Sequence, residues 1–159
     1  MVLKLLRKKN KLMGNKVIYK QEYSIKGGDF INGGEASCKI SNTLKEIGID
    51  PEIILRIAVA SYEAEMNVVM YADNGKISFI VTPYKIKLII SDRGQGIENI
   101  DKAMQPGFST ATEEMREMGF GAGMGLPNIK ENADIFNIKS EPDKGTELEI
   151  IINMRENSD

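Results

Sequence analysis

The chain has 159 residues, 42% of them hydrophobic, and a formal net charge of −2 at pH 7. This length is enough for one domain with a hydrophobic core and is short for two. The sequence contains no histidine, which excludes histidine acid–base catalysis, a Ser-His-Asp triad, a histidine phosphoacceptor and histidine metal ligands.

The single cysteine, Cys38, cannot form a disulfide within the chain. No apolar run approaches the roughly 20 residues that a membrane span needs. The sequence therefore predicts a soluble, cytoplasmic protein without stable membrane insertion.

Basic residues are concentrated at the start of the chain, where five lie within the first eleven positions. This stretch lacks the apolar segment of a secretory signal. We predict that residues 1–15 form a poorly ordered basic tail, or an extension upstream of a natural start at Met13. A short segment that binds a membrane surface or a partner is the alternative. The remainder is acidic, which argues against a nucleic-acid partner.

The first half of the chain predicts one strand and two helices. A strand over residues 16–25 precedes a glycine-containing turn at 26–29. Apolar residues at three- and four-residue spacing predict an amphipathic helix over 34–47, ended by Gly48. Asp50 before Pro51 marks the start of the longest helix, which continues to about Ala72.

The second half predicts mostly strands. Asp73-Asn74-Gly75 is expected to break the chain before a hairpin of strands 76–82 and 85–91, turned at Pro83-Tyr84. The chain is then polar and rich in glycine as far as Gly125. The elements expected after the hairpin are a short helix over 100–104, a helix over 126–133, and strands over 135–140 and 146–154.

Two polar groups are candidates for chemistry. Glu63 and Asn67 are four residues apart, so they share a face of the long helix, although an isolated pair of this kind is ordinary surface chemistry. Asp92-Arg93-Gly94-Gln95-Gly96 follows an apolar strand. A carboxylate there can accept a hydrogen bond from an exocyclic amine such as that of adenine, while a surface turn is the alternative.

Four glycines, Gly119, Gly121, Gly123 and Gly125, alternate with other residues before the helix expected from Leu126. Free backbone N–H groups at the start of that helix would suit phosphate oxygens. A flexible linker is the alternative interpretation. No G-x-x-x-x-G-K-[ST] sequence occurs, so the segment is not a P-loop.

In this order the four pieces resemble the N box, G1 box, G2 box and final Gly-Thr of the GHKL superfamily of ATPases, which includes gyrase and the histidine kinases. The matching residues are Glu63-x-x-x-Asn67, Asp92-x-Gly94-x-Gly96-Ile97, Gly121-x-Gly123-x-Gly125-Leu126 and Gly145-Thr146. Within this superfamily the chain is most similar to the anti-sigma-factor serine/threonine kinases and related switch kinases. The supporting features are its small size, Glu63 at the start of the N box, and Leu126-Pro127-Asn128-Ile129 after the glycines.

The resemblance implies an α+β fold, the Bergerat fold. This is a two-layer α/β sandwich in which a mixed, mostly antiparallel sheet carries helices on one face. It places the ATP-binding kinase domain at residues 16–154, with a C-terminal tail at 155–159.

The resemblance also implies roles for individual residues. Glu63 is the expected general base, and Asn67 the expected Mg²⁺ ligand together with the ATP phosphates. Asp92 would hold the adenine amino group, with Gly94, Gly96 and Ile97 lining the base and Thr146 behind it. The expected lid and phosphate contacts come from Ser109, Thr110, Gly119, Gly121, Gly123, Met124, Gly125 and Leu126.

The implied function is ATP-dependent phosphorylation, with Mg²⁺, of a STAS-domain antagonist protein, and a sigma factor or related signalling protein would compete for the same kinase. The alternative is an ATP-gated binding module that sequesters a partner without significant phosphotransfer. Slow ATP hydrolysis driving a conformational cycle is less expected. Homodimerisation is possible by resemblance.

Overall fold

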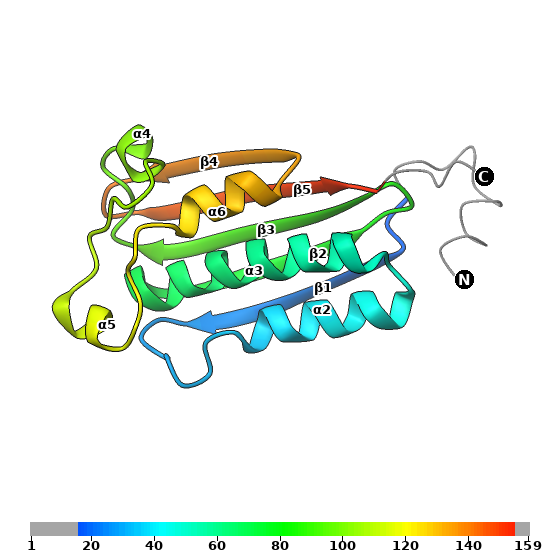
Figure 1. The fold of residues 1–159 in the computed structure, drawn as a ribbon, viewed down its shortest axis with the longest axis horizontal. Coiled ribbons are helices and arrows are strands. Elements are labelled where there is room, and N and C mark those ends of the chain that lie inside the picture. The colour runs from blue at the N-terminus through cyan, green and yellow to red at the C-terminus, as the bar shows by residue number, and fades with distance from the viewer. Residues whose placement is uncertain (1–15, 155–159) are drawn as a thin grey trace.

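A computed structural model describes residues 16–154. The two tails expected from the sequence, residues 1–15 and 155–159, lie outside this range. The described part has two layers, a five-stranded sheet and a layer of helices on one of its faces (Figure 1). The strand order is β1-β2-β3-β5-β4, and all four pairings are antiparallel. The predicted α+β two-layer fold is confirmed.

The strands and helices alternate in groups along the chain. The strands are β1 (Tyr19–Lys26), β2 (Ala72–Val81), β3 (Lys85–Gly94), β4 (Ile135–Glu141) and β5 (Gly145–Asn153). The helices are α2 (Glu35–Ile47), α3 (Pro51–Tyr71), α4 (Ile100–Ala103), α5 (Glu113–Glu117) and α6 (Gly125–Asn132). None of the helices in this part of the chain is long and apolar enough to cross a membrane.

The ends of the two long helices follow from their sequences. The Asp50 carboxylate accepts a hydrogen bond of 2.8 Å from the backbone N–H of Glu52, and Pro51 occupies the first helical position. Gly48 ends α2 with φ +85°, a left-handed conformation, and donates to the carbonyl of Leu44. Both ends use the residue types that the sequence pattern indicated.

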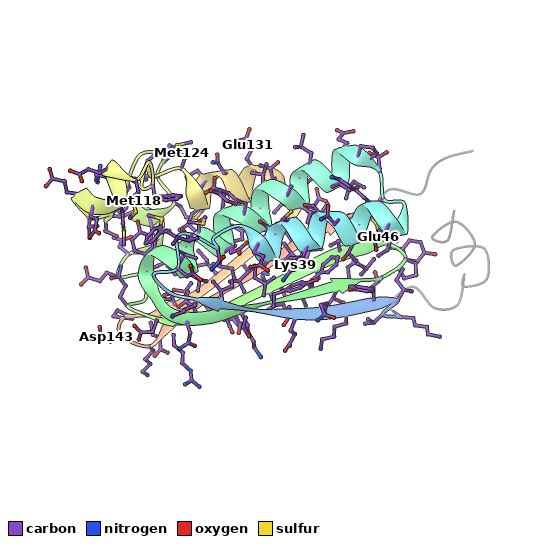
Figure 2. The ribbon with its side chains drawn as sticks, turned by 90° about the horizontal axis from the view of Figure 1, so that it is seen from below. Lys39, Glu46, Met118, Met124, Glu131 and Asp143 are labelled. Carbon is purple, nitrogen blue, oxygen red and sulfur yellow. The ribbon has the colours of Figure 1, made fainter. Side chains whose placement is uncertain are left out.

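The hydrophobic core lies between the sheet and the helices. In β3 the side chains of Ile86, Leu88 and Ile90 are buried toward the helix layer, whereas Lys87 lies on the opposite face and pairs with Glu149 at 2.8 Å. Figure 2 shows side chains of this open face extending away from the helices. This alternation is what a strand covered on one side requires.

The expected break at Asp73-Asn74-Gly75 is wrong, because these residues belong to β2. Asn74 pairs with Lys26 of β1, and Gly75 pairs with Ile25 on one side and Asp92 on the other. Pairing on both sides satisfies the backbone groups of the segment, and this outweighs its turn-forming composition. A register irregularity between Ala72 and Asn74 accommodates the change from helix to strand.

A buried carboxylate joins α2 to α3. Glu65, on α3, is 3% exposed and accepts hydrogen bonds from the backbone N–H groups of Ala36 at 3.1 Å and Ser37 at 2.9 Å. Gly34 at the start of α2 has no side chain with which to cap it. Glu65 therefore caps α2 from the neighbouring helix, two residues after Glu63.

Candidate functional site

A cavity of about 820 Å³ lies between α3, the end of β3, the β4–β5 turn, and the segment from α4 to α6. In Figure 1 the loops and short helices around this cavity lie at one end of the sheet. The predicted site residues that line it are Glu63, Asn67, Asp92, Gly96, Ile97, Ser109, Thr110, Gly119, Gly121, Gly123, Met124, Gly125, Leu126 and Thr146. Residues from four separate sequence segments are thus brought together.

One wall of the cavity combines α3 with the start of α6. Glu63 and Asn67 face Gly125 so closely that a Cβ atom on Gly125 would lie 3.3 Å from Glu63 Oε2 and 3.3 Å from Asn67 Oδ1. Across the same junction, the Asn128 amide donates to Glu63 Oε1 at 3.2 Å. A carboxylate, an amide and a helix N-terminus therefore converge at one point.

Another wall of the cavity is built around Asp92. Its Oδ1 accepts a hydrogen bond of 3.0 Å from the backbone N–H of Thr146, and the Thr146 hydroxyl lies 2.8 Å from that of Ser140. Ser140 in turn accepts from the backbone N–H of Ile97 at 2.8 Å. Gly145, with φ +122°, passes so close to the Asp92 backbone that a Cβ there would lie 2.1 Å from the Asp92 carbonyl oxygen.

Asp92 is half-buried, and burial raises the pKa of its carboxyl above the ordinary value of 3.8, while the hydrogen bond from Thr146 acts in the opposite direction. Of its two oxygens, Oδ1 takes the Thr146 N–H. The carboxyl is therefore a hydrogen-bond acceptor held in a partly desolvated wall, as recognition of a donor group on a ligand requires.

Gly94 was predicted to line the adenine base, but it does not line the cavity. It belongs to β3 and lies against the end of α3, where a Cβ would approach the Tyr71 carbonyl oxygen to 2.7 Å. Gly96 does line the cavity, with φ +70° and its backbone close to Glu141. The first glycine thus serves the packing of helix on strand, and the second serves the wall.

We call the segment 105–124 the lid, because residues 108–110 and 119–124 of it line the cavity. Its ends meet where the N–H of Gly107 donates to the carbonyl of Gly123 at 2.8 Å. α5, which the sequence did not predict, begins where the Thr112 hydroxyl accepts from the N–H of Met115 at 3.2 Å. The Phe120 ring contacts Phe30, in the loop between β1 and α2, with centroids 5.3 Å apart.

Several polar residues of the site were given no role from the sequence, and the contacts of two of them, Lys102 and Asn128, bear on its chemistry. Lys102 is the only cation among the described residues that line the cavity, and its Nζ lies 5.1 Å from the centre of the Phe108 ring. Asn128 reaches Glu63 from 65 positions along the chain. Lys102 has no sequence signal of its own, because a lysine on a short helix is a typical surface residue. Asn128 lies within the Leu126-Pro127-Asn128-Ile129 segment, but its contact with Glu63 depends on the packing of α6 on α3.

The arrangement agrees with the family that the chain matches. A model for the histidine kinase-like ATPase domain matches residues 35–152, from the first residue of α2 to the penultimate residue of β5. The chain belongs to this family.

Two relatives show the branch within it. The serine/threonine-protein kinase RsbT of Bacillus subtilis (strain 168) is 34% identical over 114 residues, 69% of this chain and 80% of that protein. An anti-sigma F factor of Caldanaerobacter subterraneus subsp. tengcongensis is 38% identical over 105 residues, 62% of this chain and 70% of that protein. The resemblance to the anti-sigma kinase branch is confirmed.

A solved structure shows the same fold. A chain in the crystal structure of the SiaB–SiaC complex from Pseudomonas aeruginosa superimposes with a TM-score of 0.54 at 12% identity. The match covers 94% of this chain and 98% of that chain. At this identity the likeness concerns the fold.

Proposed function

We propose that this chain is an ATP-dependent serine/threonine protein kinase of the anti-sigma regulatory type, which phosphorylates a STAS-type antagonist protein. The carrying observation is the position of the Glu63 carboxylate, which lies in the cavity wall beside Asn67 and the start of α6. Asp92 lines the same cavity from another wall. A nucleotide that extends between these walls would bring its terminal phosphate to Glu63.

The cavity walls suit the parts of ATP. The Asp92 carboxyl would accept a hydrogen bond from the adenine amino group, beside the apolar side chains of Ile97 and Leu148. The lid glycines and the N-terminus of α6 would present backbone N–H groups to the phosphates. Lys102 would add the positive charge that a triphosphate requires from its surroundings.

Asn67 fits a magnesium site in which the protein supplies few oxygen ligands and the substrate phosphates supply others. Its Oδ1 faces the start of α6 within the cavity wall. The described residues contain no group of three or more acidic or cysteine side chains that could hold a metal by themselves. Mg²⁺ bound there would neutralise charge on the transferred phosphoryl group.

Glu63 would act as the general base. A serine or threonine hydroxyl of the partner would lose its proton to a Glu63 carboxylate oxygen as its own oxygen bonds to the γ-phosphorus and the bond to the β–γ bridging oxygen breaks. Phosphoryl transfer of this kind depends mainly on positioning and on electrostatic stabilisation. Because the chain has no histidine, a carboxylate is the suitable base in this wall.

The names of the relatives support the partner class. One is a serine/threonine-protein kinase and the other an anti-sigma factor, which supports exchange between a STAS-type protein and a sigma factor or related regulator. On this proposal the chain acts in the cytoplasm. A homodimer is part of the same proposal and is testable by its mass in solution.

Transfer of label from γ-labelled ATP into proteins of a host-cell extract tests the proposal. We expect a discrete labelled band with the wild-type chain and Mg²⁺, and loss of that band with Glu63→Gln while ATP binding, measured by calorimetry, is retained. Glu131→Gln, on the exposed surface of α6, is the matched control and should label as the wild type does.

A band of equal intensity with Glu63→Gln would refute the assignment of the base. Absence of any band, with ATP binding intact, would instead favour the ATP-gated binding module. If Glu63→Gln also abolishes ATP binding, its role is in nucleotide binding and not in proton transfer.

A further inference from the structure

We infer that Asn128 is a positioning residue that sets the orientation of Glu63 for proton transfer, an inference that rests on the proposed kinase function. The Asn128 Nδ2 group donates to Glu63 Oε1 at 3.2 Å. The two residues come from different helices, α6 and α3, and both are half-buried. Among the described residues, Asn128 is the side chain that donates a hydrogen bond to the Glu63 carboxylate.

The contact leaves the two carboxylate oxygens in different situations. Oε1 is held by Asn128, whereas Oε2 lies on the side of Gly125 and Asn67, 3.3 Å from where a Cβ of Gly125 would be. Because a carboxylate rotates readily about its terminal torsion, fixing one oxygen fixes the direction of the other. Oε2 is therefore the oxygen presented toward the start of α6, where phosphates would bind.

Asn128 is itself held in place by its helix. Its backbone N–H donates to the Met124 carbonyl at 2.8 Å, and its carbonyl accepts from the Asn132 side chain at 2.9 Å. Gly125 belongs to the same first turn of α6. The first turn of α6, which would face the phosphates, thus also holds the Glu63 carboxylate. This turn therefore sets the distance between the base and the phosphates.

The chemistry of the amide suits this task. An asparagine side chain is neutral at all physiological pH values and donates through its NH₂ group. It orients a carboxylate without placing a positive charge beside it, and a positive charge would make the carboxylate less able to take a proton. A lysine in this place would form an ion pair in competition with the acceptor hydroxyl.

The test uses the purified full-length chain, γ-labelled ATP with Mg²⁺, and a fixed amount of host-cell extract as the source of acceptor. The variants are Asn128→Leu, which removes the donor at similar size, and Asn128→Gln, which keeps an amide. Glu131→Gln is the matched control, because Glu131 lies on the exposed surface of the same helix, α6.

We expect Asn128→Leu to lower the rate at saturating ATP by roughly 10- to 100-fold, the scale of a misplaced base, with the KM and Kd for ATP changed less than about 2-fold. Asn128→Gln should recover part of the rate, and Glu131→Gln should retain the wild-type rate. In the Glu63→Gln background, Asn128→Leu should cause no further loss, since residues that act as a unit are not additive.

A wild-type rate for Asn128→Leu, a fall confined to ATP affinity, or a further loss in the Glu63→Gln background would overturn the inference while the kinase function stands. An equal loss with Glu131→Gln would show a general effect on α6 and overturn it as well. If labelling by the wild-type chain does not depend on Glu63, both the proposed function and this inference are refuted. If Asn128→Leu fails to fold, Asn128→Gln and Asn128→Ala supply the same comparison.

Discussion

At the scale of single residues, Asp92 is in an environment that suits binding more than folding. Burial raises the pKa of its carboxyl, so ionisation at neutral pH works against the folded state. The Thr146 N–H offsets only part of that effect, since it is the second and smaller cause. A carboxylate kept in such a place is typical of a functional site.

We predict that Asp92→Asn weakens ATP binding by about 1.5–3 kcal/mol, the contribution of a charge-assisted hydrogen bond in a closed pocket. The substitution preserves shape and an oxygen that accepts from Thr146, so the fold should be retained. Calorimetric titration with ATP measures the change, and Asp101→Asn, exposed on α4, is the control. Unchanged affinity in Asp92→Asn would rule out the adenine assignment.

The pH dependence of stability provides a second prediction at this residue. An acid with a raised pKa in the folded state binds its proton more tightly there than in the unfolded chain. Its stabilising contribution is therefore complete below the ordinary value of 3.8 and is lost as the pH rises through the raised value. We expect Asp92→Asn to match the wild type in acid and to become more stable than it toward neutral pH.

Denaturant unfolding of the nucleotide-free protein from about pH 3 to about pH 7 measures this difference. A difference in unfolding free energy that stays constant over the whole interval would contradict it, because a pH-independent effect cannot come from the Asp92 carboxyl.

At the scale of elements, the buried Glu65 carboxylate is expected to determine how firmly α2 is attached. Glu65→Ala leaves the N–H groups of Ala36 and Ser37 without their acceptor. We predict a loss of about 2–4 kcal/mol in the free energy of unfolding, since each buried unsatisfied donor costs about 1–3 kcal/mol. Glu65→Gln should lose less, because its amide oxygen still accepts one of the two bonds.

Chemical denaturation measures this loss, with Glu46→Ala as the control. Glu46 is exposed near the C-terminal end of α2, where Figure 2 labels it. A loss of the same size in Glu46→Ala would attribute the effect to helix propensity and not to capping.

The lid is held to the rest of the domain by the contact between Phe120 and Phe30. We predict that Phe120→Ala speeds hydrogen exchange across residues 105–124 and speeds release of ATP, because the ring that anchors the lid is lost. Phe30→Ala should do the same from the other side. The double variant should show a coupling free energy of about 0.5–1.5 kcal/mol, as aromatic pairs do.

Independent, additive effects of the two substitutions would contradict this role. Met118, an exposed residue of the lid that Figure 2 shows at the same end of the molecule as Met124, offers a control. Met118→Ala should leave both hydrogen exchange and ATP release close to those of the wild type.

At the scale of the whole molecule, the sequence predicted the layered fold and most of the cavity lining. The helices could be predicted because their start and stop signals, such as Asp50-Pro51 and Gly48, act locally. Most of the cavity lining could be predicted because its residues occur in four short sequence motifs. What these features share is that each is decided by residues close together in the chain.

The errors concern features decided by distant residues. Asp73-Asn74-Gly75 became part of a strand because β1 and β3 pair with it, and no local rule anticipates partners about 20 or 50 positions away. Gly94 was assigned to the cavity from its motif, but its place against Tyr71 depends on how α3 meets the sheet. The contact of Asn128 with Glu63 likewise exists only once α6 packs on α3.

The most direct test of the kinase assignment is the chemical nature of the phosphorylated residue. The labelled protein from the transfer reaction would be isolated and its phosphoamino acid identified by acid hydrolysis and mass spectrometry. A serine or threonine phosphoester on a STAS-type protein, formed with the wild type and not with Glu63→Gln, is the predicted result. An acid-labile phosphohistidine or phosphoaspartate, or a phosphoester that forms without Glu63, would contradict the account.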